Sequence, residues 1–168
     1  MSVRRRYPLQ QLLKLRAHRT GKARLLVAER QRAVAACREA CARIEAEIDA
    51  LRNERAVQRG RILAPPPAGI PLPLALEQRE AHIDWLGERE QAALELLAQA
   101  RQQLQQAEQA LAEAMQAFFR TKAREDALEK RKTVWRGEMA ALEARQEEDA
   151  AADIVQAAHC PRTEVHGA

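Results

Sequence analysis

Proline placement divides this 168-residue chain into two long segments. Five of the seven prolines fall between residues 65 and 73, and the other two, Pro8 and Pro161, lie near the ends. Proline lacks a backbone N–H donor and its ring clashes with the preceding helical turn, so no helix is expected to run through the 65–73 segment. The sequence therefore permits two long helices separated by one break.

Both segments between the prolines repeat apolar residues at alternating spacings of three and four, which is typical of a coiled coil. The first series contains Leu9, Leu13, Ala23, Val27, Val34, Cys37, Cys41, Ile44, Ile48, Leu51 and Ile62. The second contains Leu76, Ile83, Leu86, Ala93, Leu97, Ala100, Leu104, Ala107, Leu111, Ala114, Phe118, Leu128, Trp135, Met139 and Leu142. Because only 3% of the residues are aromatic and 31% are charged, burial is expected along a narrow seam rather than in a thick core. The predicted fold is all-α, a long two-helix antiparallel coiled-coil hairpin.

This hairpin is predicted to form a single coiled-coil domain spanning residues 1–168. Helix 1 covers about 8–63, a Pro-rich turn 64–73, helix 2 about 74–156, and a disordered tail 157–168. A turn of about ten residues spans at most about 35 Å, whereas the first helix would be roughly 80 Å long, so the helices must be antiparallel.

Matching Ile62 with Leu76 across the turn predicts the register of the two helices. The residue numbers of facing partners should then sum to about 138. This register brings Tyr7 and Trp135 to within about one helical turn of each other, where they are expected to close the apolar seam.

No group of residues predicts an enzyme, a metal centre or a cofactor site. The four histidines are scattered, and the sequence contains neither a Cys-x-x-Cys pair nor a Gly-rich phosphate loop. Cys37 and Cys41 lie on the predicted seam, where small apolar packing is favoured over metal binding. A chelate formed by His159, Cys160 and His166 in the tail is a weaker alternative. No apolar run is long enough to insert in a membrane, and the odd number of cysteines fits a reducing, cytoplasmic compartment.

Positive charge is concentrated at the start of the chain. Residues 1–65 contain sixteen Lys and Arg against six Asp and Glu, whereas residues 66–168 contain twelve against eighteen. Residues 1–24 contain no acid at all. A solvated helix start, a nucleic-acid surface, a membrane surface and an acidic protein partner all fit this pattern. The nucleic-acid interpretation lacks aromatic stacking platforms, and the membrane interpretation lacks aromatic anchors other than Tyr7.

Two motifs carry a resemblance to a family. Residues Tyr7–Arg16 (YPLQQLLKLR) resemble the opening of the flagellar export protein FliJ, in which an aromatic–x–Leu–Gln entry leads into a Leu-rich first turn. Residues Leu128–Lys132 (LEKRK) are similar to the basic Leu-Glu-Lys segment late in that family's second helix. FliJ and its injectisome counterpart, the YscO family, are stalk components of type III secretion machines. The long, stiff Pro-rich turn favours the injectisome, virulence-associated branch.

The resemblance implies a non-enzymatic central stalk without a cofactor, inserted in the hexameric secretion ATPase and linking it to the cytoplasmic domain of the export gate. It further implies a cytoplasmic protein, peripheral at the inner-membrane secretion apparatus, with secretion chaperones as additional partners and neither nucleic-acid binding nor direct membrane insertion. The residues expected to bind the ATPase are Arg4, Arg5, Arg6, Lys14, Arg16, Arg19, Lys130, Arg131 and Lys132. The residues expected to bind the export gate are Ile70, Leu72 and Leu74. A general coiled-coil scaffold or chaperone-like adaptor is the alternative function.

Overall fold

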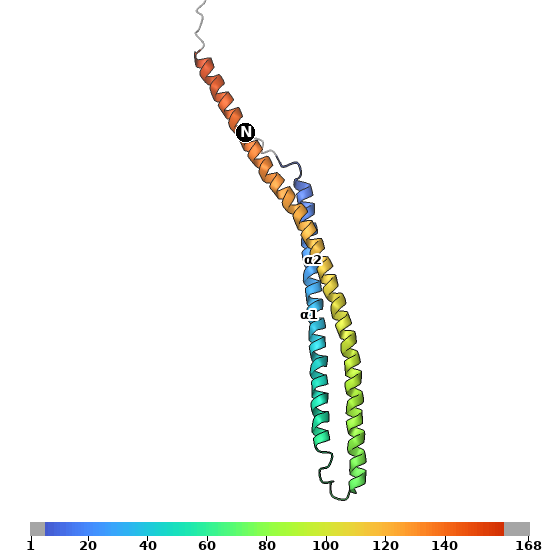
Figure 1. The fold of residues 1–168 in the computed structure, drawn as a ribbon. Coiled ribbons are helices and arrows are strands. Elements are labelled where there is room, and N and C mark those ends of the chain that lie inside the picture. The colour runs from blue at the N-terminus through green and yellow to red at the C-terminus, as the bar shows by residue number, and fades with distance from the viewer. Residues whose placement is uncertain (1–5, 160–168) are drawn as a thin grey trace, which may run out of the picture. The chain divides into compact units, whose positions relative to one another are not determined.

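The computed structural model describes residues 6–159, which form two helices, α1 (Gln10–Gly60) and α2 (Leu72–His159). The helices pack against each other in opposite directions on either side of the Pro-rich turn (Figure 1). Residues 6–159 contain no β-strand. The predicted all-α, two-helix antiparallel hairpin is therefore confirmed.

Helix boundaries differ from the predicted ones by two to three residues. α1 begins at Gln10 and ends at Gly60 instead of spanning about 8–63. α2 begins at Leu72 because the carbonyl of Pro71 accepts a hydrogen bond from the Ala75 amide at 3.1 Å, and a proline in the first helical turn sacrifices no helical hydrogen bond.

The end of α2 corrects the boundary of the predicted tail. Residues 157–159 belong to α2, which is consistent with the strong helix propensity of Ala157 and Ala158. The rest of that predicted tail, residues 160–168, lies outside the described residues.

The chain separates into two compact units, which are described one at a time. The turn unit comprises residues 23–118, and the terminal unit combines residues 1–22 with residues 119–168. In the turn unit, Cys41 and Ile48 of α1 pack with Ala93 and Leu97 of α2. A partly buried layer of Ile44, Leu51, Leu94, Ala100 and Leu104 surrounds this cluster. Burial thus follows the predicted 3–4 series, with Cys41 in the apolar seam.

Ion pairs across the seam of the turn unit join α1 to α2. Arg52 Nε donates to Glu90 Oε1 at 2.7 Å, and Arg55 Nη1 donates to Glu90 Oε2 at 3.4 Å. Further pairs join Arg38 to Glu108, Glu47 to Arg89 and Glu45 to Arg101. Most of these side chains are at least half exposed, so such pairs add little free energy and mainly favour one alignment of the helices.

Glu90 is the least exposed member of this network and occupies a seam position. Its carboxylate accepts hydrogen bonds from two guanidinium groups, and the bond from Arg52 is the main reason why the pKa of Glu90 is lowered from 4.5. On α2 nearby, Gly87 makes room for one of these arginines, since a Cβ atom there would lie 3.0 Å from Arg55 Nη2. An acidic residue is therefore accommodated where the heptad pattern calls for an apolar one.

The register of the helices is shifted from the predicted one by about one turn. Facing partners sum to 142 at Arg24–Phe118 and Arg52–Glu90 in the turn unit, and at Tyr7–Trp135 in the terminal unit. The predicted sum of about 138 is wrong because Ile62 does not face Leu76. Instead, the segment after α1 continues along α2, and Arg79 binds the carbonyl oxygens of Ile62 and Ala64 at 2.8 and 2.7 Å.

Candidate functional site: a basic terminal surface and an apolar turn

An aromatic contact closes the seam of the terminal unit. The rings of Tyr7 and Trp135 lie 5.4 Å apart between centroids at an interplanar angle of 57°, as the sequence predicted. Leu13 and Thr20 continue the buried line along α1, and the Thr20 hydroxyl donates to the carbonyl of Arg16 at 3.1 Å. Leu9, predicted to belong to the seam, is instead 41% exposed, because it precedes α1 and Tyr7 packs against Trp135 in its place.

The Tyr7 hydroxyl is buried and has no hydrogen-bond partner among the described residues. Leaving a buried hydroxyl unpaired costs about 1–3 kcal/mol. The ring of Tyr7 contributes to the seam through apolar and aromatic contact.

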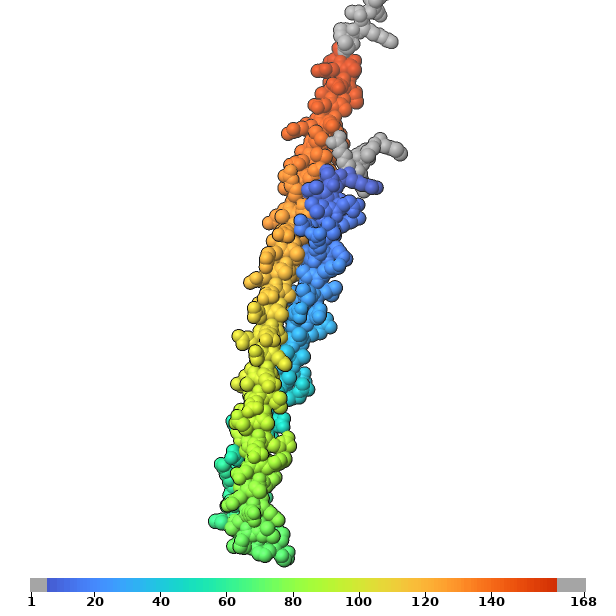
Figure 2. Space-filling model, turned by 90° about the vertical axis from the view of Figure 1, so that its right-hand side faces the viewer, coloured from blue at the N-terminus to red at the C-terminus, as the bar shows by residue number. Residues whose placement is uncertain are grey.

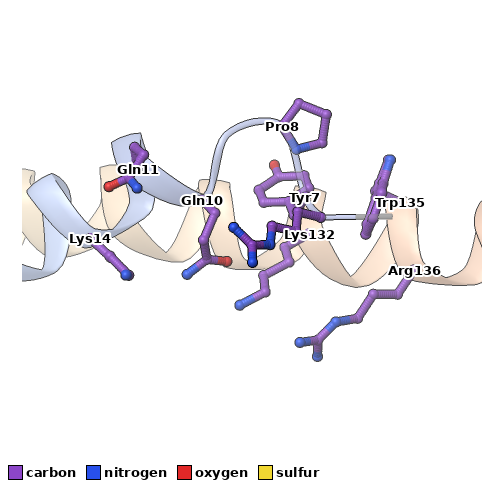
Figure 3. A pocket seen from close by; sticks show the side chains of 9 residues that line it. Tyr7, Pro8, Gln10, Gln11, Lys14, Lys132, Trp135 and Arg136 are labelled. Atoms are coloured by element: carbon purple, nitrogen blue, oxygen red, sulfur yellow. The ribbon is translucent and has the colours of Figure 1, made fainter. Parts of the chain in front are cut away.

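A cleft of about 510 Å³ lies beside this aromatic pair. Its lining consists of Arg6, Tyr7, Pro8, Gln10, Gln11, Lys14, Lys132, Trp135 and Arg136. Figure 3 shows the polar ends of Gln10, Lys14, Lys132 and Arg136 extending toward the same side of the two helices. Four of the nine lining residues are cationic and none is acidic, so the cleft offers hydrogen-bond donors on a positively charged wall.

The positive charge of this cleft is not neutralised within residues 6–159. In that part of the chain, no carboxylate forms an ion pair with Arg6, Lys14, Lys132 or Arg136. Like charges held close together repel one another, and an external anion would relieve that repulsion. The cleft is therefore suited to an acidic or anionic partner.

Seven of the nine residues expected to bind the ATPase are described in the terminal unit, and together with Arg136 we call these seven the basic terminal surface. Lys14 and Arg19 of α1 and Lys130 and Arg131 of α2 are exposed, whereas Arg16 and Lys132 are half-buried. Arg4 and Arg5 lie outside the described residues. Sequence reasoning missed Arg136, although its position one turn after Lys132 and next to Trp135 was a usable signal.

Beyond the aromatic pair, α2 continues without a second helix beside it. Every residue from 140 to 159 is exposed, and Figure 2 shows the end of α2 with no other helix against it on the visible face. A small cleft of about 330 Å³ lies at the start of this stretch, lined by Glu138, Met139, Ala141, Leu142 and Arg145. Leu142, predicted to belong to the seam, is 36% exposed because α1 begins at Gln10 and does not extend alongside this part of α2.

The turn unit exposes two of the three residues expected to bind the export gate. Leu72 and Leu74 are 48% and 45% exposed on the first turn of α2, and Ile70 is half-buried. Leu63, which sequence reasoning did not include, is 81% exposed in the same connection. Three exposed leucines therefore lie within residues 63–74, in the connection and the first turn of α2.

The conformation of the turn is fixed by specific contacts. Besides its two shorter bonds, Arg79 Nη2 donates to the carbonyl of Pro65 at 3.3 Å. The amide of Ile70 donates to the carbonyl of Pro67 at 3.2 Å, and Gly69 adopts a φ of 87°, which residues with a Cβ atom rarely adopt. The turn therefore presents its apolar side chains on a constrained backbone.

Residues 6–159 contain no group of three or more His, Cys, Asp or Glu side chains arranged to hold a metal ion. Within the same residues, neither helix is long and apolar enough to cross a membrane. The candidate functional features of the described chain are thus two surfaces, one basic and one apolar.

Comparison with known proteins identifies the family to which this helical hairpin belongs. The YscO-like family model matches residues 4–164. Among solved structures, the chain is similar to a proposed YscO homolog from Chlamydia trachomatis, with 22% sequence identity and a TM-score of 0.70. The similarity covers 92% of this chain and 95% of the other, and at this identity it supports the fold. No curated protein matches the chain.

The described residues form an α-helical hairpin with one basic and one apolar exposed surface. Because the family model covers nearly all of the sequence, this protein belongs to the YscO-like family. It is a type III secretion-associated protein, and the family is a structural component of the secretion apparatus.

Proposed function

We propose that this protein is a central stalk of a type III secretion apparatus, which binds the hexameric secretion ATPase through the basic terminal surface. The observation that carries this proposal is the positive charge of the cleft on that surface, which both helices contribute and which no carboxylate of residues 6–159 pairs with. A partner lined by acidic side chains or outward carbonyl oxygens would complement it, and charge complementarity mainly sets the association rate and the choice of partner.

The stalk contributes no chemistry of its own in this proposal. The ATPase holds and hydrolyses the nucleotide, and the bound hairpin favours its assembled or active form. A two-helix seam with interlocked side chains suits such a role because a packed helix pair resists bending better than one helix does. The injectisome branch of the secretion machines is favoured by family membership.

Stimulation of the cognate ATPase tests this function. Purified protein should show no ATP hydrolysis by itself, and its addition should raise the turnover number of the ATPase or lower the enzyme concentration needed for hexamer assembly. The effect should weaken as salt rises, since exposed charges are screened over about 8 Å at physiological ionic strength. If ATPases from the same gene cluster show neither effect, the stalk function is wrong.

The second contact of the proposed stalk is with the cytoplasmic domain of the export gate, through the apolar turn. Supporting observations are the exposed Leu63, Leu72 and Leu74 and the backbone constraints from Arg79. Changing Leu72 and Leu74 to Ser should impair gate binding and secretion while leaving ATPase stimulation intact. Loss of stimulation with normal gate binding would reverse the assignment of the two ends.

A further inference from the structure

The cleft beside Tyr7 and Trp135 has properties that protein docking alone does not require. Its cations come from three parts of the chain: Arg6 precedes α1, Lys14 lies on α1, and Lys132 and Arg136 lie one turn apart on α2. All four line the same volume of about 510 Å³, which is within the range of small-molecule sites. The four cationic residues are therefore brought together by the fold and are not consecutive in the sequence.

The chemistry of the lining favours phosphate groups over single carboxylates. A phosphate group carries about −1.5 to −2 charges and three strong acceptor oxygens. The four positive charges of the cleft exceed the negative charge of one carboxylate or one phosphate group. They match the negative charge of a diphosphate or triphosphate. Arginine donates two parallel hydrogen bonds to phosphate oxygens, and the amides of Gln10 and Gln11 add further donors.

The position of Trp135 and Tyr7 limits where such an anion would lie. The rings of Tyr7 and Trp135 contact each other and both line the cleft, while the side chains of Lys14, Lys132 and Arg136 extend to one side of the two helices (Figure 3). Apolar walls reduce the local dielectric constant, which strengthens the attraction between the cations and a bound phosphate.

We propose that this cleft is a binding site for a compact polyphosphate anion, held by Arg6, Lys14, Lys132 and Arg136. The site overlaps the surface assigned to the ATPase, but binding of the anion needs only the isolated chain. A failure of this proposal is therefore distinguishable from a failure of the stalk function.

Isothermal titration calorimetry of the full chain with tripolyphosphate tests the site. At constant ionic strength, one tripolyphosphate should bind per chain, with affinity decreasing from tripolyphosphate to pyrophosphate to phosphate. Changing Lys132 and Arg136 to Gln should weaken binding at least about tenfold, since hydrogen bonds to charged groups are among the stronger ones.

A matched control separates a built site from general attraction to positive charge. Lys130 and Arg131 are exposed neighbours on α2 that do not line the cleft, and changing both to Gln removes the same net charge. This control variant should bind tripolyphosphate within about twofold of the wild type. Circular dichroism of both variants should show unchanged helix content.

Three outcomes would overturn the proposal. Equal weakening in the cleft variant and the control would mean that the anion senses only overall charge. Binding of citrate as tight as that of tripolyphosphate would assign the cleft to carboxylates. Absence of saturable binding to the wild type would leave the cleft without a phosphate ligand.

Discussion

Truncating Leu97 in the turn unit is expected to destabilise the hairpin much more than truncating its neighbour Leu96. Leu97 is 6% exposed and packs with Cys41, Ile48 and Ala93, whereas Leu96 is 54% exposed on the same helix. The change Leu97→Ala removes three carbon atoms from the seam, which costs roughly 2.4 kcal/mol at about 0.8 kcal/mol for each. A cavity that the seam cannot close adds to this, so the expected loss is about 2–4 kcal/mol.

The matched change Leu96→Ala should alter the free energy of unfolding by less than about 0.5 kcal/mol. Urea unfolding followed by far-UV circular dichroism measures both values, with the slope against urea expected to stay constant. Both variants lose the same side-chain atoms at adjacent helical positions, so helix propensity cancels between them. Equal destabilisation by the two changes would refute the assignment of Leu97 to the buried seam.

Two further predictions concern single side chains. Because the folded-state pKa of Glu90 is lowered from 4.5, mainly by Arg52, its ionised form stabilises the fold above pH 4.5, and that contribution is lost as pH falls through the lower folded pKa. Unfolding at several pH values should therefore show a deficit in Glu90→Gln at neutral pH that vanishes in acid, and a deficit independent of pH would contradict the ion pair. In the terminal unit, Trp135→Ala should lower the melting temperature because it removes the aromatic contact with Tyr7. Tyr7→Phe should preserve or raise the melting temperature, because it removes a buried hydroxyl that has no partner among the described residues. A large decrease in the melting temperature of Tyr7→Phe would mean that this hydroxyl has a partner.

Much of the hairpin was predictable because its architecture depends on local sequence features. The proline cluster identified the turn, and the 3–4 spacing identified Leu13, Cys41, Ile48 and Leu97 as seam residues. The antiparallel direction followed from the short reach of the connection. The Tyr7–Trp135 contact was also predicted, since its partners are nearly opposite in either register.

The register and the cleft were less accessible to sequence reasoning. The one-turn shift depends on the turns after α1, at residues 61–64, which Arg79 holds against α2, and no heptad pattern encodes a side chain binding distant carbonyl oxygens. The cleft joins Arg6, Lys14 and Arg136 across two helices, so its residues come together only in that register. Leu63 was missed because the 3–4 series does not include it, and its exposure follows from its place after the end of α1.

A binding titration of charge-reversed variants tests whether the basic terminal surface binds the secretion ATPase. In the terminal variant, Lys130 and Lys132 are changed to Glu. In the control variant, Arg59 and Arg61 are changed to Glu, which alters the net charge by the same amount at the turn end of α1. Fluorescence anisotropy of the labelled chain with increasing ATPase should show affinity reduced at least about tenfold in the first variant and nearly unchanged in the control. Equal affinity of the terminal variant and the wild type, or equal loss in both variants, would contradict the assignment of this surface to the ATPase.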